Sequence, residues 1–156
     1  MNYQEILIKG SRILRTNNIK SYNLDCELIL SKVLNKTREE ILFNLNNKIN
    51  NKQQRKFDFF LKKRKSKTPI SYILGFKYFW RYKFYINKSV LIPRPESEHL
   101  VEQALNCIPL GKSINILDIG TGSGCLIISI LRERQDCLAS AIEISKEALK
   151  VAKINA

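Results

Sequence analysis

The feature that most constrains this chain is a short loop with glycine at every second position, placed after an apolar run. Residues 120–124 read Gly-Thr-Gly-Ser-Gly, and residues 114–119 before them have the composition of a buried strand. Residues 125–131 after the loop have helical character. Alternate glycines let the backbone turn tightly and let a ligand approach where a Cβ would intrude. A strand, a glycine loop and a helix in this order predict a pocket for a nucleoside-type cofactor.

Strand and helix patterns alternate around this loop. Strands are predicted at 114–119 and 137–143, and helices at 124–132 and from Ser145 onward. Strand, helix, strand, helix implies a parallel sheet with right-handed crossovers. The C-terminal part of the chain is therefore expected to be the beginning of an α/β domain.

The residues just before this α/β segment are expected to be extended and then helical. Aromatic side chains crowd residues 76–86, a composition typical of a β-hairpin. Residues 90–95 are predicted to be extended, because a residue before proline avoids the helical region. Pro95 or Glu96 opens a helix, and the residues expected on its inward face are Leu100, Val101 and Leu105.

Short helices are predicted up to about residue 75, and none is long enough to be stable alone. Thr37 and Glu40 are placed as a capping box, and Thr68-Pro69 starts a brief helix that Gly75 can terminate. We expect these helices to pack as a small bundle. Their predicted inward residues are Ile6, Leu7, Ile13 and Leu14, then Leu24, Leu28, Ile29 and Val33, and then Phe57, Phe60 and Leu61.

The chain carries a strong positive charge. Its formal net charge is +13, and the excess is densest from Lys48 to Lys67. Such an excess favours weak affinity for nucleic acid or a ribonucleoprotein partner. Lysine is abundant throughout the chain, however, so a solvated helix face explains the same excess, and we favour this second interpretation.

The sequence predicts no membrane span, no signal peptide and no metal site. No apolar run approaches the roughly 18 residues of a membrane span, and the N-terminus lacks the basic-then-apolar order of a signal peptide. A cytoplasmic protein is therefore expected. The widely spaced Cys26, Cys107, Cys125 and Cys137 are predicted to be buried or half-buried thiols, and His99 an ordinary surface residue.

Two carboxylates frame the glycine loop. Asp118 precedes it, and Glu143 ends the next strand, near the spacing of roughly 20 residues expected for an acid that binds ribose hydroxyls. A G-x-G-x-G loop preceded by an acid is typical of S-adenosylmethionine-dependent methyltransferases. Alternatively, the glycines only allow tight packing and Glu143 only caps the next helix. The candidate cofactor site comprises Asp118, Gly120, Thr121, Gly122, Ser123, Gly124 and Glu143.

The chain resembles the peptide-chain release factor glutamine methyltransferase family over nearly its whole length. Residues 117–125 resemble the family's first methyltransferase motif. Residues 141–145, followed by Ala148-Leu149, Ala152 and Asn155-Ala156, resemble its second, where aspartate is usual at position 143. Residues 69–75 resemble its linker entry, and residues 90–98 the signature before its catalytic domain. By this resemblance the signature borders the cofactor pocket, to which it contributes Arg94, Pro95 and Glu96.

The resemblance implies three parts. Residues 1–75 would be a helical substrate-recognition domain, residues 76–94 a β-hairpin linker, and residues 95–156 the start of a Rossmann-like class I methyltransferase domain. The implied reaction is S-adenosylmethionine-dependent methylation of the glutamine side-chain amide in the Gly-Gly-Gln motif of class 1 release factors. The family's Asn-Pro-Pro-Tyr motif, which holds the target amide, is absent from this sequence. We therefore expect a fragment that is inactive alone.

Three alternatives remain open. A ribosomal-protein glutamine methyltransferase is closely related, although Pro93-Arg94-Pro95-Glu96 fits the release factor enzymes better. An adenine- or RNA-directed methyltransferase would give the basic charge a purpose. The chain is also compatible with a non-catalytic helical module that binds a ribosome-associated partner.

Overall fold

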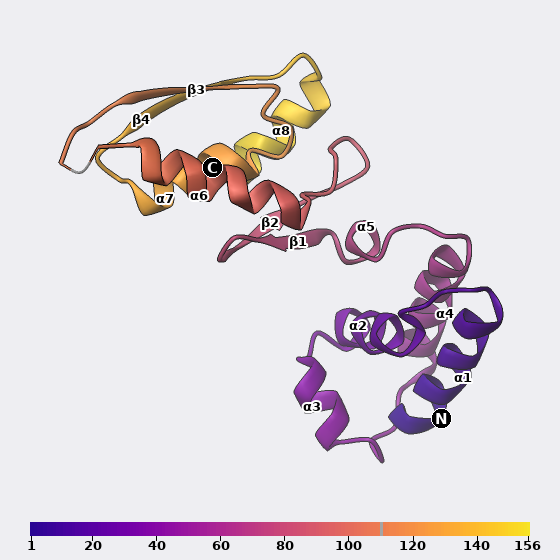
Figure 1. Cartoon of the computed structure of the whole chain (residues 1–156). Coiled ribbons are helices and arrows are strands. Elements are labelled where there is room, and N and C mark those ends of the chain that lie inside the picture. The colour runs from indigo at the N-terminus through magenta and orange to yellow at the C-terminus, as the bar shows by residue number, and fades with distance from the viewer. Residues whose placement is uncertain (110) are drawn as a thin grey trace. The chain divides into compact units, whose positions relative to one another are not determined.

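The computed structural model describes residues 1–109 and 111–156, which form two compact units (Figure 1). The first unit is Met1–Leu74, and the second is Gly75–Ala156. The first is built from helices, and the second combines helices with a β-hairpin and a parallel strand pair. Helices followed by βαβα units are the mixed α/β fold class that the sequence predicted. Within the described residues no helix combines the length and apolarity needed to cross a bilayer.

Helices form the first unit, and three of them begin with a capping box. Their bounds are α1 Tyr3–Thr16, α2 Tyr22–Leu34, α3 Arg38–Phe43, α4 Asn51–Lys65 and α5 Ile70–Leu74. The predicted capping box is confirmed, since the Glu40 N–H donates to the Thr37 hydroxyl at 3.2 Å and the Thr37 N–H to the Glu40 carboxylate at 2.6 Å. Two further capping boxes, which we did not predict, begin α1 and α4: Asn2 with Glu5, and Asn50 with Gln53.

The core of the first unit lies among α1, α2 and α4. Gly10 lets these helices approach closely, because a Cβ at this position would lie 3.0 Å from both Cys26 Sγ and Phe57 Cζ. Most of the inward residues predicted from periodicity are in this core. Its buried members include Ile6, Leu14, Cys26, Ile29, Leu30, Val33, Ile41, Phe57 and Leu61.

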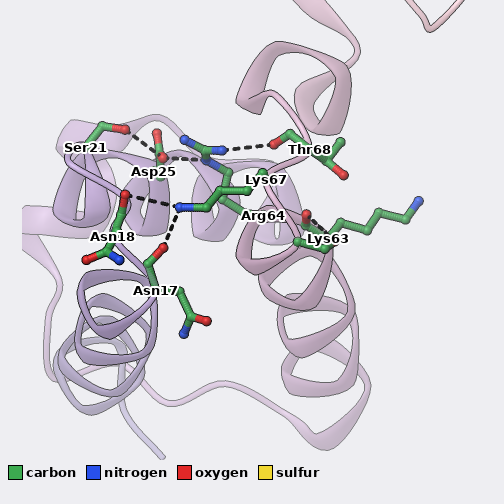
Figure 2. A network of polar contacts seen from close by, with 9 residues as sticks. Asn17, Asn18, Ser21, Asp25, Lys63, Arg64, Lys67 and Thr68 are labelled. Carbon is green, nitrogen blue, oxygen red and sulfur yellow. Dashed lines mark hydrogen bonds and ion pairs between the residues drawn. The ribbon is translucent and has the colours of Figure 1, made fainter.

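The inward face of α2 holds a carboxylate where we predicted a leucine. Leu24 is 44% exposed, whereas Asp25 is 1% exposed. A buried carboxylate needs polar partners, and Figure 2 shows them: Arg64 Nε donates at 2.7 Å and Ser21 Oγ at 2.8 Å. Arg64 also donates to the Thr68 carbonyl oxygen at 3.2 Å. The prediction for Leu24 was wrong because α2 is oriented so that Asp25 faces Arg64 on α4. The apolar periodicity of α2 gives no sign of that arginine.

The second unit begins with a hairpin and continues as alternating helices and strands. Its elements are β1 Phe76–Phe79, β2 Tyr82–Tyr85, the 3-10 turn η1 Pro95–Ser97, α6 Glu98–Cys107, β3 Asn115–Ile119, α7 Cys125–Glu133, β4 Leu138–Ile142 and α8 Lys146–Asn155. β1 and β2 pair antiparallel, and β3 pairs in parallel with β4, as predicted. On α6, Val101 is buried, but Leu100 is 59% exposed, so our prediction for Leu100 was wrong.

The tip of the hairpin is fixed to α6 and α7. Trp80 has a positive φ of 55°, and its N–H donates to Glu98 Oε1 at 2.9 Å. The Trp80 indole N–H and the Tyr82 hydroxyl both donate to Glu133 Oε1, at 2.8 and 3.1 Å. These bonds, above all the one from Trp80, lower the pKa of Glu133. The hairpin is thereby held against the helices of its own unit.

One face of the parallel strand pair is open among the described residues. Figure 1 shows α6, α7 and α8 on the same side of β3 and β4. Ile119 pairs with Ile142 across the two strands, so their side chains share a face. The apolar side chains on the open face are Leu117 (58% exposed), Ile119 (73%), Leu138 (68%) and Ile142 (52%). An exposed apolar area of this kind marks an interaction surface or a ligand-binding surface.

Candidate functional site

The glycine loop joins the end of β3 to the start of α7. Gly120, Gly122 and Gly124 have positive φ of 78°, 56° and 80°, a region that other residues rarely adopt. A Cβ at Gly120 or Gly122 would meet no atom within 4 Å, so the backbone conformation and not close packing explains these two glycines. Gly124 differs, because its Cβ would lie 2.7 Å from Ile128 Cδ1. The first two glycines therefore leave an open backbone surface.

Hydrogen bonds hold the loop against both strand ends. The Thr121 hydroxyl donates to Asp118 Oδ2 at 2.7 Å. The backbone N–H groups of Gly120 and Thr121 donate to the Ile142 carbonyl oxygen, at 2.8 and 3.1 Å. The two non-glycine members of the loop, Thr121 and Ser123, are buried. The loop is thus a fixed turn on the carboxyl ends of β3 and β4, where α/β folds bind their ligands.

Glu143 bridges the second strand to the glycine loop. Its Oε1 accepts from the Ser145 N–H and its Oε2 from the Gly122 N–H, both at 2.9 Å. These donors, Ser145 first and Gly122 second, lower the pKa of the Glu143 carboxyl. The cap of α8 is Ser145, whose hydroxyl accepts from the Ala148 N–H at 3.2 Å. The carboxylate therefore stays ionised beside the loop, and a different side chain caps the helix.

A hollow of about 420 Å³ adjoins this carboxylate. Its lining residues are Ile119, Gly120, Ile142, Glu143 and Ile144. The three isoleucines are exposed, and Ile144 is 99% exposed. The hollow thus places an apolar surface next to a charged acceptor, which suits a ligand with a flat apolar part and hydroxyl groups.

Asn155, the last residue of α8, is hydrogen-bonded to the glycine loop. We did not predict it as a site residue from the sequence. Its Nδ2 donates to the Ser123 carbonyl oxygen at 2.8 Å and to the Tyr85 carbonyl oxygen at 3.0 Å. The Tyr85 N–H donates to its Oδ1 at 2.7 Å. One amide therefore connects α8, β2 and the glycine loop. The sequence shows Asn155 within the second motif but gives no sign of these partners.

The structure does not join Arg94 and Glu96 to the loop. Both are exposed: Arg94 lies just before η1, and Glu96 lies within it. The Ser97 N–H donates to the Arg94 carbonyl oxygen at 3.0 Å. No hydrogen bond or ion pair with a described residue involves either side chain. Pro95 is the first residue of the same turn. A role for these three residues at the cofactor pocket stays a prediction.

Among the four cysteines and the histidine, Cys125 directly follows the glycine loop. Cys125 begins α7, and burial raises the pKa of its thiol, while burial raises that of Cys26 to about 11. Cys137 is buried as predicted, but Cys107 is exposed, which corrects our prediction for it. His99 is exposed. No three His, Cys, Asp or Glu residues of the described chain gather closely enough to hold a metal ion.

Comparison with known proteins agrees with the motif resemblance. Residues 5–75 match the family model described as the PrmC N-terminal domain. Over 137 residues, 88% of this chain, the sequence is 41% identical to the release factor glutamine methyltransferase of Coxiella burnetii. Residues 5–75 thus belong to the PrmC N-terminal domain family, and the chain as a whole is similar to release factor glutamine methyltransferases.

Two further relatives extend the match along the chain. The sequence is 37% identical over 153 residues to the release factor glutamine methyltransferase of Leptospira interrogans, and 35% identical over 156 residues to that of Salmonella typhimurium. The alignments cover 97% and 100% of this chain but 53% and 55% of these two relatives, and 50% of the Coxiella burnetii protein. The chain therefore spans about half the length of the curated relatives it matches.

Proposed function

We propose that this chain supplies part of an S-adenosylmethionine-dependent methyltransferase that modifies the glutamine amide in the Gly-Gly-Gln motif of class 1 release factors. The observation that supports a cofactor site is the Glu143 carboxylate, held by the Gly122 N–H beside an open glycine loop and an apolar hollow. The names of the relatives support the substrate class. The geometry fits S-adenosylmethionine in three respects.

First, Glu143 is placed to accept hydroxyl groups. Each of its oxygens receives one backbone N–H, so each keeps a second acceptor position. A vicinal diol donates two hydrogen bonds, and an ionised carboxylate with two free positions matches it. The lowered pKa keeps Glu143 in this ionised form at neutral pH.

Second, the hollow offers apolar contact for a flat base. Ile119, Ile142 and Ile144 expose most of their surface there. Covering such side chains with an aromatic ring removes apolar area from water, worth roughly 25 cal/mol per Å². The adenine would thus lie against these isoleucines while the ribose reaches Glu143.

Third, the loop and Asp118 suit the charged end of the cofactor. Without a Cβ, Gly120 and Gly122 allow close approach to the backbone. Asp118 uses Oδ2 for Thr121, and its negative charge attracts an ammonium or sulfonium group. When bound, the cofactor would supply a methyl group on a sulfonium, whose sulfur leaves as a neutral thioether when the methyl is transferred. Because an amide nitrogen is a poor nucleophile, the protein must contribute chiefly orientation.

The remaining residues would serve the protein substrate. Residues 1–75 would recognise the release factor, residues 76–94 would connect the parts, and residues 95–156 would begin the catalytic domain. The match of residues 5–75 to the PrmC N-terminal domain supports a distinct role for the helical part. Arg94, Pro95 and Glu96 would border the cofactor pocket from η1.

The test is a chimera in which this chain replaces the matching half of the Coxiella burnetii enzyme. With radiolabelled S-adenosylmethionine, the chimera should label one glutamine of a release factor, and the 156-residue chain alone should label none. Glu143→Ala should reduce labelling at least about tenfold, because a charge-assisted acceptor is worth roughly 1.5–3 kcal/mol. Glu147→Ala removes an exposed acid of α8 and is the matched control. A folded, cofactor-binding chimera that labels nucleic acid and not the release factor would contradict the proposal.

A further inference from the structure

Helix α4 presents one row of cations to solvent. Positions 52, 55, 56, 59, 62 and 63 recur at intervals of three and four residues, so they share one face of the helix. The opposite face carries the buried Phe57 and Leu61. All members of the row are exposed, and we call them the α4 stripe: Lys52, Arg55, Lys56, Phe59, Lys62 and Lys63.

The charge of the α4 stripe is not neutralised by the described residues. None of its five cations forms an ion pair within that part of the chain, whereas the neighbouring Arg64 is paired with Asp25. In Figure 2, Arg64 points toward Asp25 and Lys63 points away from it. Like charges three or four residues apart, such as Lys52 and Lys56, repel each other and destabilise a helix. A polyanion on this face would remove that repulsion.

An aromatic ring lies in the middle of these cations. Phe59 is 55% exposed, and Lys63 Nζ lies 4.4 Å from the centroid of its ring. An acidic peptide would use the cations and leave the exposed part of the Phe59 ring in water. A nucleic acid with unpaired bases would use both, because bases stack on aromatic side chains while phosphates meet lysine and arginine. Folded RNA presents such bases in its loops and bulges.

We propose that the α4 stripe binds an unpaired segment of an RNA. The phosphates lie along the cations of successive helical turns, and one base stacks on Phe59. This activity is separate from the cofactor site, since it uses only side chains of α4. It gives a function to five of the chain's 27 lysine and arginine residues.

Fluorescence anisotropy of a labelled RNA hairpin with a uridine-rich loop tests the aromatic contact on the 156-residue chain. Phe59→Ala should weaken binding at least about fivefold, since stacking of one base is worth roughly 1–3 kcal/mol. Phe43→Ala is the matched control, because Phe43 is 88% exposed on α3 and outside the stripe. Phe59→Tyr keeps an aromatic ring and should retain the affinity of the unchanged chain.

The salt dependence of binding tests the cations. The double variant Lys56→Gln/Lys63→Gln should reduce the slope of log affinity against log salt by about 1.4, at about 0.7 per lost phosphate contact. Lys20→Gln/Lys36→Gln removes the same charge from exposed lysines off the stripe and should leave the slope unchanged. Helical circular dichroism spectra of all variants confirm that they fold.

Three results would overturn the proposal. Equal losses from the two double variants would show that net charge alone attracts the RNA. Equal affinity for a blunt RNA duplex and for the hairpin loop would exclude a role for unpaired bases. Displacement of the RNA by polyglutamate as readily as by unlabelled hairpin would assign the stripe to an acidic protein.

Discussion

Replacing Asp25 by alanine should strongly destabilise the helical unit. Asp25 and Arg64 have side chains that are 2% and 15% exposed, so the substitution leaves a largely buried guanidinium without its carboxylate. Breaking a buried pair costs roughly 3–5 kcal/mol. Arg64 keeps its bond to the Thr68 carbonyl and some solvent contact, which reduces our expectation to about 2–3 kcal/mol. At about 4–8 °C per kcal/mol in a small domain, the melting temperature should fall by roughly 8–24 °C.

Urea unfolding followed by circular dichroism measures this loss. The matched control is Glu27→Ala on the same helix, where the ion pair with Arg38 is much more exposed and should contribute less than about 1 kcal/mol. The double variant Asp25→Leu/Arg64→Met removes both charges and should recover most of the stability. Equal losses from Asp25→Ala and Glu27→Ala, or no recovery in the double variant, would refute the reasoning.

Three further predictions concern the second unit. Asn155→Ala removes three hydrogen bonds and should lower its stability by about 2–3 kcal/mol in urea; an unchanged midpoint would contradict the connecting role. Gly124→Ala combines a φ of 80° with a contact of 2.7 Å and should cost about 2–4 kcal/mol by thermal melting, more than Gly111→Ala, which has a φ of 69° and no atom within 4 Å. The pKa of Glu143 is lowered, chiefly by the Ser145 N–H, so its contribution is present above the unfolded value of about 4.3 and is lost as pH falls through the lower folded pKa. Stability curves against pH should therefore be flatter below about 4.3 for Glu143→Gln, and identical curves would be evidence against the bridge.

Local signals predicted most of the fold. Apolar periodicity located the helices and strands, and the Thr37 capping box began α3 as expected. Leu24 and Leu100 were misplaced because each depends on which way its helix turns in the tertiary structure. A buried carboxylate such as Asp25 is invisible to hydrophobic patterns, since its partner lies 39 residues away in sequence.

The candidate site could be predicted only in part from the sequence. The glycine loop and Glu143 were predicted from spacing, because a strand end and a following loop have a fixed local relation. The bond between Gly122 and Glu143 and the contacts of Asn155 join residues far apart in the chain. Such contacts depend on how strands and helices pack, which no local pattern encodes.

The central claim is that the glycine loop and Glu143 form a cofactor site. At 18.1 kDa, the chain is small enough for an amide NMR titration with S-adenosylmethionine. We predict shifts centred on residues 118–124 and 142–145, which Glu143→Ala abolishes and Glu147→Ala leaves intact. Shifts confined to residues 1–75, or shifts at the loop that survive Glu143→Ala unchanged, would contradict the claim.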